Sequence, residues 1–201
     1  MVARRNVVIG CGSLLLVAAV ASVAVVAYFA FSVAQNSKAK GTGASVTESR
    51  DVALFERLDV TAPVEVELSD GEFSGQLRLE IDEGWKDDAV VNVQANVLSI
   101  GFKENRKAVC PDGRTCVFRV FLVVPPNLNQ INLTPPVNLT TPADRPLKLQ
   151  ELTIEHRADS KKDESYLCVN GEFSEKFTAR LDGHSHSTFA GSCPHAVYNT
   201  T

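Results

Sequence analysis

The sequence predicts an all-β domain that follows one membrane-spanning α-helix, and three observations support this fold class. An uncharged apolar run lies near the N-terminus. The later chain alternates apolar and polar side chains, which is the period of a half-buried strand. Turn dipeptides and proline pairs separate the alternating stretches, as they do between short strands. We therefore divide the chain into a cytoplasmic stub (1–6), a transmembrane signal-anchor helix (7–34), a flexible linker (35–51) and an all-β extracytoplasmic domain (52–201).

The apolar run, Val7–Ala34, carries no charged side chain and is long enough to span a bilayer. A helix of about 20 apolar residues crosses the ~30 Å hydrocarbon layer and satisfies its own backbone groups there. Arg4 and Arg5 precede the run and favour a cytoplasmic N-terminus, although Lys38 and Lys40 beyond it weaken this bias. We expect a single-pass membrane protein with its C-terminal domain at the cell surface, in the periplasm or in a lumen.

A cleaved signal peptide is the alternative interpretation of this run. Ser32–Ala34 supplies the small residues that signal peptidase needs before a cut at Gln35. The apolar core of a signal peptide is usually about 7–15 residues long, which is shorter than this run. A retained anchor is therefore preferred, and both interpretations place the domain outside the cytoplasm.

Residues 35–51 are polar and show no apolar period, which is typical of a flexible linker. The residues that follow are numerous enough for one domain with its own core. The chain has 20 Lys and Arg against 24 Asp and Glu, and its net charge is −4. This balance argues against a nucleic-acid partner, which requires a basic face.

The strands are predicted in chain order by apolar residues at every second position. Such alternation begins at Val64–Leu68 and returns in several later stretches, namely Leu77–Ile81, Leu98–Phe102, Leu147–Leu149, Leu152–Ile154 and Phe177–Leu181. Phe118–Val124 is apolar on both faces apart from Arg119, which is typical of a covered strand. The short strands after Pro146 favour a short β-solenoid, or β-helix, whose coils stack on one another. A β-sandwich is the alternative.

Four cysteines follow the membrane run, and an even number in an exported domain predicts two disulfides. A Pro-Asp-Gly turn lies between Cys110 and Cys116 and can bring their thiols together. We predict the pairs Cys110–Cys116 and Cys168–Cys193. A zinc site is the alternative, but Cys110 and Cys116 lie further apart in sequence than the about two to four intervening residues that are usual for zinc ligands.

His184 and His186 are the sharpest candidates for metal ligands, because residues two apart on a strand face the same way. With His195 or Cys193 they could bind zinc or copper. The alternative is a solvated strand face, and we predict no metal and no other cofactor.

Two further features are candidates for surface sites. Asn132 and Asn138 begin Asn-x-Thr sequons, which mark surface loops in a host that glycosylates. The acidic segment Asp82–Asp88 is expected to be a solvated loop with Trp85 as its packing anchor. A carbohydrate platform on Trp85 is the alternative.

Several short motifs resemble the auto-transporter adhesin, head GIN domain family. The predicted domain begins like that family. Phe55–Val60 resembles its first core strand, and Val64–Gly71 resembles the Val-x-Val strand and turn that follow. Its later steps are resembled by Asn96–Ile100, Val120–Pro125 and Gly183–Gly191. The resemblance covers about residues 52–195 and implies a β-helix-like envelope or surface module of bacteria. The cysteines depart from that family's pattern.

These observations predict a membrane-anchored, non-enzymatic module that adheres to, or scaffolds, envelope components. Its expected partners are the membrane, which it spans once, and a surface protein or glycan. The alternative is a polysaccharide-acting or metal-dependent hydrolase on a β-helix scaffold. That chemistry needs acids and histidines that converge in one groove.

Overall fold

The computed structural model describes residues 39–103, 108–112, 115–134, 136–157, 164–183 and 185–200. They belong to one compact unit, Lys38–Thr201. The predicted stub (1–6) and membrane helix (7–34) lie outside the described residues. Within the described ranges, no helix is both long enough and apolar enough to cross a bilayer.

The described residues form an all-β unit, which confirms that part of the predicted fold class. A single 3-10 turn, η1 (Glu83–Trp85), interrupts the strands. The strands are β1 (Ala39–Lys40), β2 (Ser45–Asp51), β3 (Arg57–Val60), β4 (Val64–Ser69), β5 (Gln76–Asp82), β6 (Ala89–Gln94), β7 (Val97–Phe102), β8 (Ala108–Val109), β9 (Phe118–Val123), β10 (Gln130–Leu133), β11 (Val137–Thr140), β12 (Leu147–Arg157), β13 (Ser165–Asp182), β14 (Ser185–Ser192) and β15 (His195–Thr200). β1 pairs with β8, and the other strands form one sheet.

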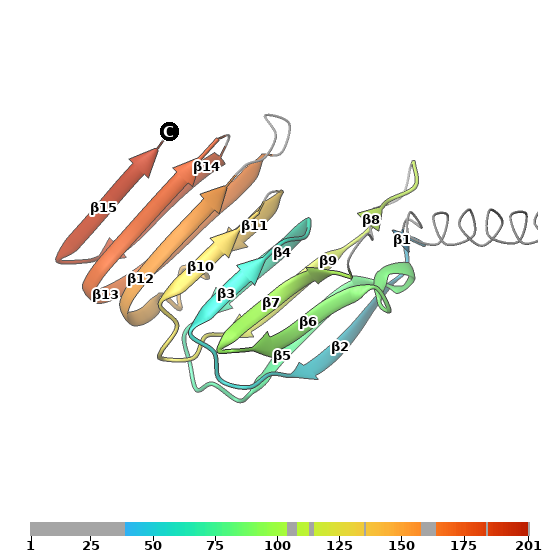
Figure 1. Ribbon diagram of the computed structural model, residues 1–201, viewed down its shortest axis with the longest axis horizontal. Helices are drawn as coiled ribbons and strands as arrows, with labels where there is room; N and C mark the ends of the chain where they lie inside the picture. The colour runs from blue at the N-terminus through green and yellow to red at the C-terminus, as the bar shows by residue number, and fades with distance from the viewer. Residues whose placement is uncertain are drawn as a thin grey trace, which may run out of the picture. The chain divides into compact units, whose positions relative to one another are not determined.

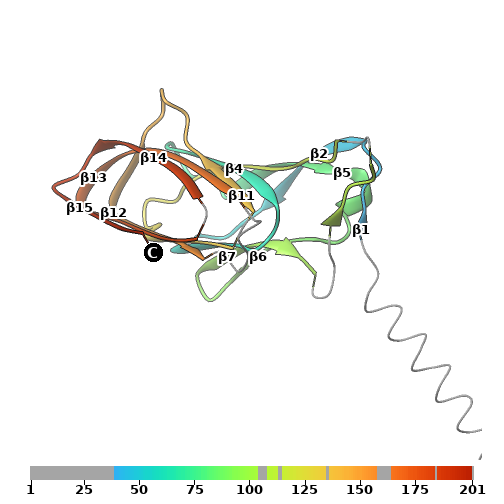
Figure 2. The ribbon, with the colours of Figure 1, turned by 90° about the horizontal axis from the view of Figure 1, so that it is seen from above.

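The large sheet is folded so that the chain passes back and forth between two faces (Figures 1 and 2). The β10 face consists of β6, β7, β3, β10, β12, the second half of β13 and β15. The β11 face consists of β2, β5, β9, β4, β11, the first half of β13 and β14. Neighbouring strands are parallel except where β2, β5 and β6 pair, so most of the sheet is built by repeated passes in the same direction.

The core lies between the two faces, because in-register pairing stacks the inward side chains of successive strands. On the β10 face, one buried ladder runs through Leu98, Leu58, Ile131, Ile154 and Ala179. On the β11 face, the matching ladder runs through Val120, Val66, Leu139 and Leu167. Full burial of one such Leu or Ile side chain contributes about 1.5–3 kcal/mol. The repeated apolar positions therefore hold the two faces together.

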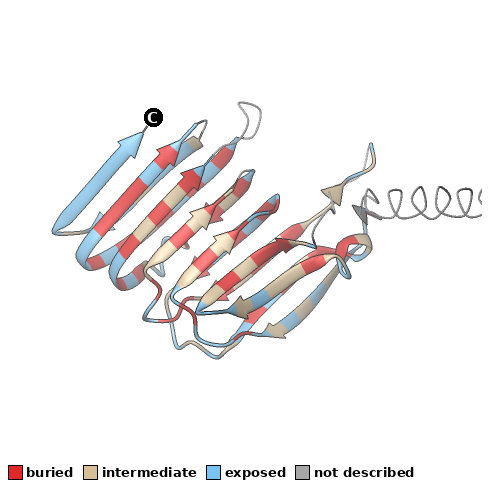
Figure 3. Cartoon of the chain, viewed as in Figure 1, coloured by how far each residue is buried: buried red, intermediate tan, exposed pale blue. Residues whose placement is uncertain are grey.

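The stack ends at β14 and β15. The ladder of the β10 face passes from Ala179 to Tyr198, whose side chain is 55% exposed. Figure 3 shows β15 exposed along its whole length. Phe177, Phe189 and Tyr198 form an aromatic cluster at this end, with ring centroids 5.1 to 5.8 Å apart.

The expected flexible linker, 35–51, is wrong in its second half, because Ser45–Asp51 forms β2 and pairs with β5. The apolar period is missing there because two inward positions carry charges. Glu48 and Arg50 form an ion pair, and Arg50 also donates to the carbonyl of Ala89 at 3.3 Å. An edge strand that fills its inward face with paired charges gives no hydrophobic alternation in the sequence.

Candidate functional site

The solvent side of the β11 face carries stacked polar and aromatic rows. Inward apolar residues alternate with outward ones, so the register that stacks the core also stacks the surface. The first row contains Glu80, Arg119, Glu65, Asn138, Tyr166 and His186. The second row contains Arg78, Phe121, Glu67, Thr140, Cys168 and Thr188.

A groove of about 510 Å³ follows these rows across β9, β4, β11 and β13. Its side-chain lining comes mainly from Glu65, Glu67, Arg119, Phe121, Asn138, Thr140 and Tyr166. Asn138 on β11 is shorter than Glu65 and Tyr166, which flank it on β4 and β13, and Thr140 is shorter than Glu67, its neighbour on β4. Because neighbouring strands lie about 4.8 Å apart, β4 and β13 stand about 10 Å from each other across this floor.

Tyr166 forms one wall of the groove. Its side chain is 50% exposed, and its ring stacks on His186 with centroids 5.1 Å apart and planes inclined by 16°. The first half of β13 lies between β14 and β11. Since His186 on β14 covers one ring face, the other face of Tyr166 is turned toward the β11 side, where Asn138 is its register partner.

Charged and aromatic side chains form the opposite wall. Arg119 lies between Glu65, at 2.5 Å, and Glu80, at 3.5 Å. The hydrogen bond from Arg119 to Glu65 and the charge of Glu65 raise the pKa of Arg119. Arg78 lies over the Phe121 ring at 3.9 Å, a cation–π contact. Arg119, the cation of this wall, and Arg78 on the neighbouring strand β5 are therefore both already engaged with protein groups.

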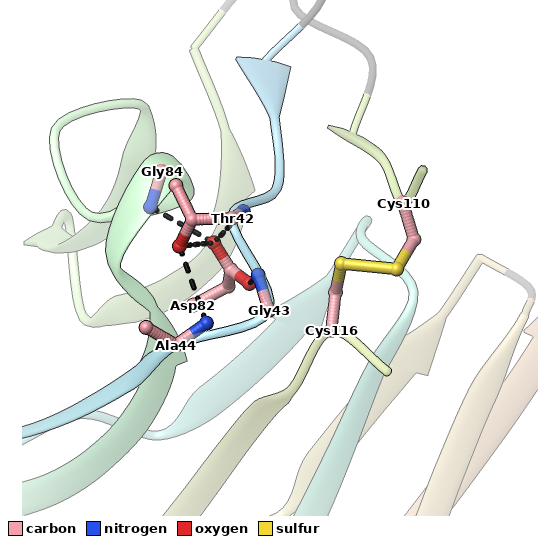
Figure 4. Close-up of a disulfide and its surroundings, with 7 residues drawn as sticks. All are labelled: Thr42, Gly43, Ala44, Asp82, Gly84, Cys110 and Cys116. Atoms are coloured by element: carbon pink, nitrogen blue, oxygen red, sulfur yellow. Dashed lines mark hydrogen bonds between the residues drawn. A yellow bond between two sulfur atoms is a disulfide. The ribbon is translucent and has the colours of Figure 1, made fainter. Parts of the chain in front are cut away.

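A second cluster of polar groups surrounds Asp82 at the end of β5 (Figure 4). Its carboxylate accepts hydrogen bonds from the backbone N–H groups of Thr42 and Gly84 at 2.8 Å and of Gly43 at 2.7 Å. Burial by itself raises the pKa of Asp82, but these N–H donors outweigh burial and hold the pKa below its usual value. Asp82 joins the start of the described chain to η1, so the expectation that it lies in a solvated loop is wrong.

Trp85 is a packing anchor, as predicted. Its side chain is 5% exposed and meets the Phe102 ring edge-on at 5.8 Å. A buried ring offers no face to a sugar, so the alternative of a carbohydrate platform on Trp85 is wrong.

The predicted histidine ligands are not assembled by the described residues. His184 lies outside them, His186 stacks on Tyr166, and His195 begins β15 on the other face. The parts of the chain that the structure describes contain no group of three His, Cys, Asp or Glu side chains placed to hold a metal. Asp87 and Asp88 precede β6, at the end of the sheet opposite β14. The described residues therefore do not bring together the acids and histidines that the hydrolase alternative requires.

The disulfide prediction is half right. Cys110 and Cys116 are bonded, with Cα atoms 5.7 Å apart (Figure 4). The predicted pair Cys168–Cys193 is wrong, since both thiols are free. Cys168 lies opposite Thr188 in the register, whereas Cys193 follows the end of β14. Five residues from Thr188 to Cys193 span about 16 Å of extended chain, well beyond the reach of a disulfide.

The expectation that the sequon asparagines lie in surface loops is also wrong. Asn132 lies in β10, where it donates to Asp59 at 2.8 Å and accepts from Gln130 at 2.9 Å. Asn138 lies in β11, on the floor of the groove. Both side chains belong to outward rows of strands.

No protein family model matches the chain, and no curated protein is similar to it in sequence. Among solved structures, a "putative lipid binding protein" of Parabacteroides distasonis has a TM-score of 0.67 at 15% identity. The match covers 82% of this chain and 65% of that protein, so the chain spans less than two thirds of its length. At this identity the comparison shows a shared fold alone.

Two further solved structures are more distant. A "putative adhesin" of Parabacteroides merdae has a TM-score of 0.47 at 11% identity, with 80% of this chain and 98% of that one covered. A "putative adhesin" of Bacteroides fragilis has a TM-score of 0.42 at 11% identity, with coverages of 81% and 95%. Membership of the head GIN domain family stays a prediction.

Proposed function

We propose that this chain is a membrane-anchored, extracytoplasmic binding module that acts by adhesion or as an envelope scaffold, without catalysis. In this proposal the all-β unit is a short, two-faced β-solenoid displayed on an N-terminal signal anchor. The observation that carries the proposal is the grooved outer surface of the β11 face, with its register-stacked rows of solvent-facing side chains.

The sheet suits this role because its surface side chains are fixed by the same register as its core. Outward residues on neighbouring strands stand at regular spacing and keep their neighbours. Stacked parallel strands thus present an extended surface that needs little ordering when a ligand binds. Such a surface favours recognition over chemistry.

Two features support the proposed location, anchored in the membrane and outside the cytoplasm. The uncharged run Val7–Ala34 has the length of a membrane span. The Cys110–Cys116 disulfide supports an oxidising compartment, because such bonds persist mainly outside the cytoplasm. The name of the structural neighbour from Parabacteroides distasonis, a "putative lipid binding protein", supports a binding role.

The proposal is tested with the full chain produced in bacteria. We expect it to stay in the membrane fraction after an alkaline wash, and to bind intact envelope preparations saturably when it is coupled to beads. A chain that washes off the membrane would contradict the anchor. Binding that never saturates, or no binding at all, would contradict the adhesive role.

A further inference from the structure

We infer that the groove on the β11 face binds an uncharged oligosaccharide, with Tyr166 as the platform on which a sugar ring stacks. This inference rests on the proposed function and gives it a ligand class. Four properties of the groove lead to it: an aromatic face, unpaired hydrogen-bonding groups, a neutralised cation and an open end.

The aromatic face belongs to Tyr166. Half of the surface of Tyr166 is exposed to water. A ligand that covers the ring removes apolar surface from water, which favours binding. The stack on His186 fixes the orientation of the ring and leaves its other face available as one wall of the groove. The C–H face of a pyranose is the flat, weakly polar surface that packs against such a wall.

Short polar groups line the floor beside this ring. Asn138 offers a carbonyl oxygen and two N–H donors, and Thr140 offers a hydroxyl. Glu67 is exposed and forms no ion pair with the described residues, so both of its oxygens can accept hydrogen bonds. This set of closely spaced donors and acceptors matches the hydroxyl groups around a sugar ring.

The charges of the groove argue against an anionic ligand. Arg119 is the only cation among the described residues that line it, and Glu65 and Glu80 already flank its guanidinium. Glu67 adds a negative charge without a partner. A phosphate, a sulfated sugar or an acidic lipid headgroup would meet repulsion here, whereas a neutral sugar would not.

The size and shape of the groove favour a chain of sugars. Its volume of about 510 Å³ falls in the usual range for ligand sites, roughly 300–1,000 Å³. A second hollow of about 230 Å³ shares Glu65, Arg119 and Asn138 with it and continues toward Pro63 and Pro136. One ring can stack on Tyr166 while its neighbours extend along this path.

The test is calorimetric titration of the full chain in a detergent without sugar headgroups, so that the detergent does not compete. The probes are neutral hexasaccharides of β-1,4-glucose, α-1,4-glucose, β-1,4-mannose and β-1,4-N-acetylglucosamine. We expect at least one probe to bind with a Kd below about 1 mM. Tyr166→Ala should weaken that binding at least tenfold, and Tyr166→Phe, which keeps the ring, should change it less than threefold.

Tyr198→Ala is the matched control, because Tyr198 is exposed to a similar extent but lies on β15 outside the groove. It should leave the affinity unchanged, and Glu67→Gln should weaken it severalfold. Circular dichroism establishes that each variant keeps its strands. If no hexasaccharide binds, or if Tyr166→Ala binds as the unchanged chain does, the inference is overturned.

Binding measurements on the same chain distinguish a failure of this inference from a failure of the proposed function. Saturable binding to intact envelopes without any hexasaccharide binding would reject the sugar ligand and leave the adhesive role standing. Binding to vesicles of anionic phospholipid in place of sugars would reject the inference in the same way. If the full chain does not bind intact envelopes at all, the proposed function itself is rejected.

Discussion

At the scale of single residues, the carboxylate of Asp82 connects parts of the chain that are distant in sequence. It is 1% exposed, and its hydrogen bonds reach Thr42 and Gly43 across about forty residues of chain. The acidic sequence around it indicates a solvated loop. Only the fold reveals that backbone N–H groups surround this one carboxylate.

We predict that Asp82→Asn destabilises the unit by about 2–3 kcal/mol, because the amide presents an NH₂ group where the carboxylate accepted hydrogen bonds. Urea unfolding followed by fluorescence of Trp85, the only tryptophan, measures this loss. Asp144→Asn, at an exposed turn, is the control and should change little.

The pH dependence of Asp82 follows from its lowered pKa. Its contribution to stability is present above the ordinary carboxyl pKa of 3.8 and is lost as the pH falls through the lower pKa of the folded state. The difference in stability between the unchanged chain and Asp82→Asn should therefore shrink in acid. A constant difference across pH 3 to pH 7 would contradict this account.

His156 gives a second pH-dependent prediction, because it is buried without a full set of partners. Its Nδ1 lies 3.1 Å from the carbonyl oxygen of Asp182, and its Nε2 has no partner among the described residues. Burial lowers the pKa of His156, which the nearby carbonyl and charge of Asp182 only partly oppose. Below pH 6.5, His156 therefore binds a proton in the unfolded chain, whereas in the folded chain it stays neutral until the pH reaches its lower folded-state pKa.

Stability should consequently fall as the pH drops below about 6.5, until the folded-state pKa is reached. His156→Leu should remove this acid-side decline, and urea midpoints at pH 7.5 and pH 5.5 measure it. His195→Gln, at an exposed position on β15, should leave the decline in place. An unchanged slope in His156→Leu would show that other groups cause it.

At the scale of strands, the hydrophobic pattern predicted β4, β5, β7, β9, β12 and the second half of β13 correctly. The predicted stretches Val64–Leu68, Leu98–Phe102 and Phe177–Leu181 all fall in strands, with their apolar residues inward. The two-residue period is the same whatever a strand pairs with, so it could not supply the register. The groove depends on register, because it gathers residues as distant as Glu67 and Tyr166. Their residue types alone carried no signal for this site.

β14 requires a glycine at position 191 in order to pair with β13. The φ of Gly191 is +116°, and a Cβ there would overlap the carbonyl oxygen of Gly171, its register partner on β13. We predict that Gly191→Ala separates the end of β14 from β13. Hydrogen exchange should quicken for amides in 185–192 and stay slow in β3 and β10. Ala190→Ser, at the neighbouring exposed position, should change neither region.

At the scale of the whole molecule, the central claim is that the grooved β11 face is displayed outside the cytoplasm. The sequence predicts the membrane segment, and the fold supplies the surface that would be displayed. Cys168 provides a natural reporter for both, because its exposed thiol lies in the second row of that face.

The most direct measurement is therefore the reaction of Cys168 with a membrane-impermeant maleimide on intact spheroplasts that carry the full chain with Cys193→Ser. A matched chain that also carries Cys168→Ser reports the background. We predict that Cys168 is labelled before lysis, and that lysis adds little further label. Labelling that occurs only after lysis would place this face inside the cytoplasm and contradict the account.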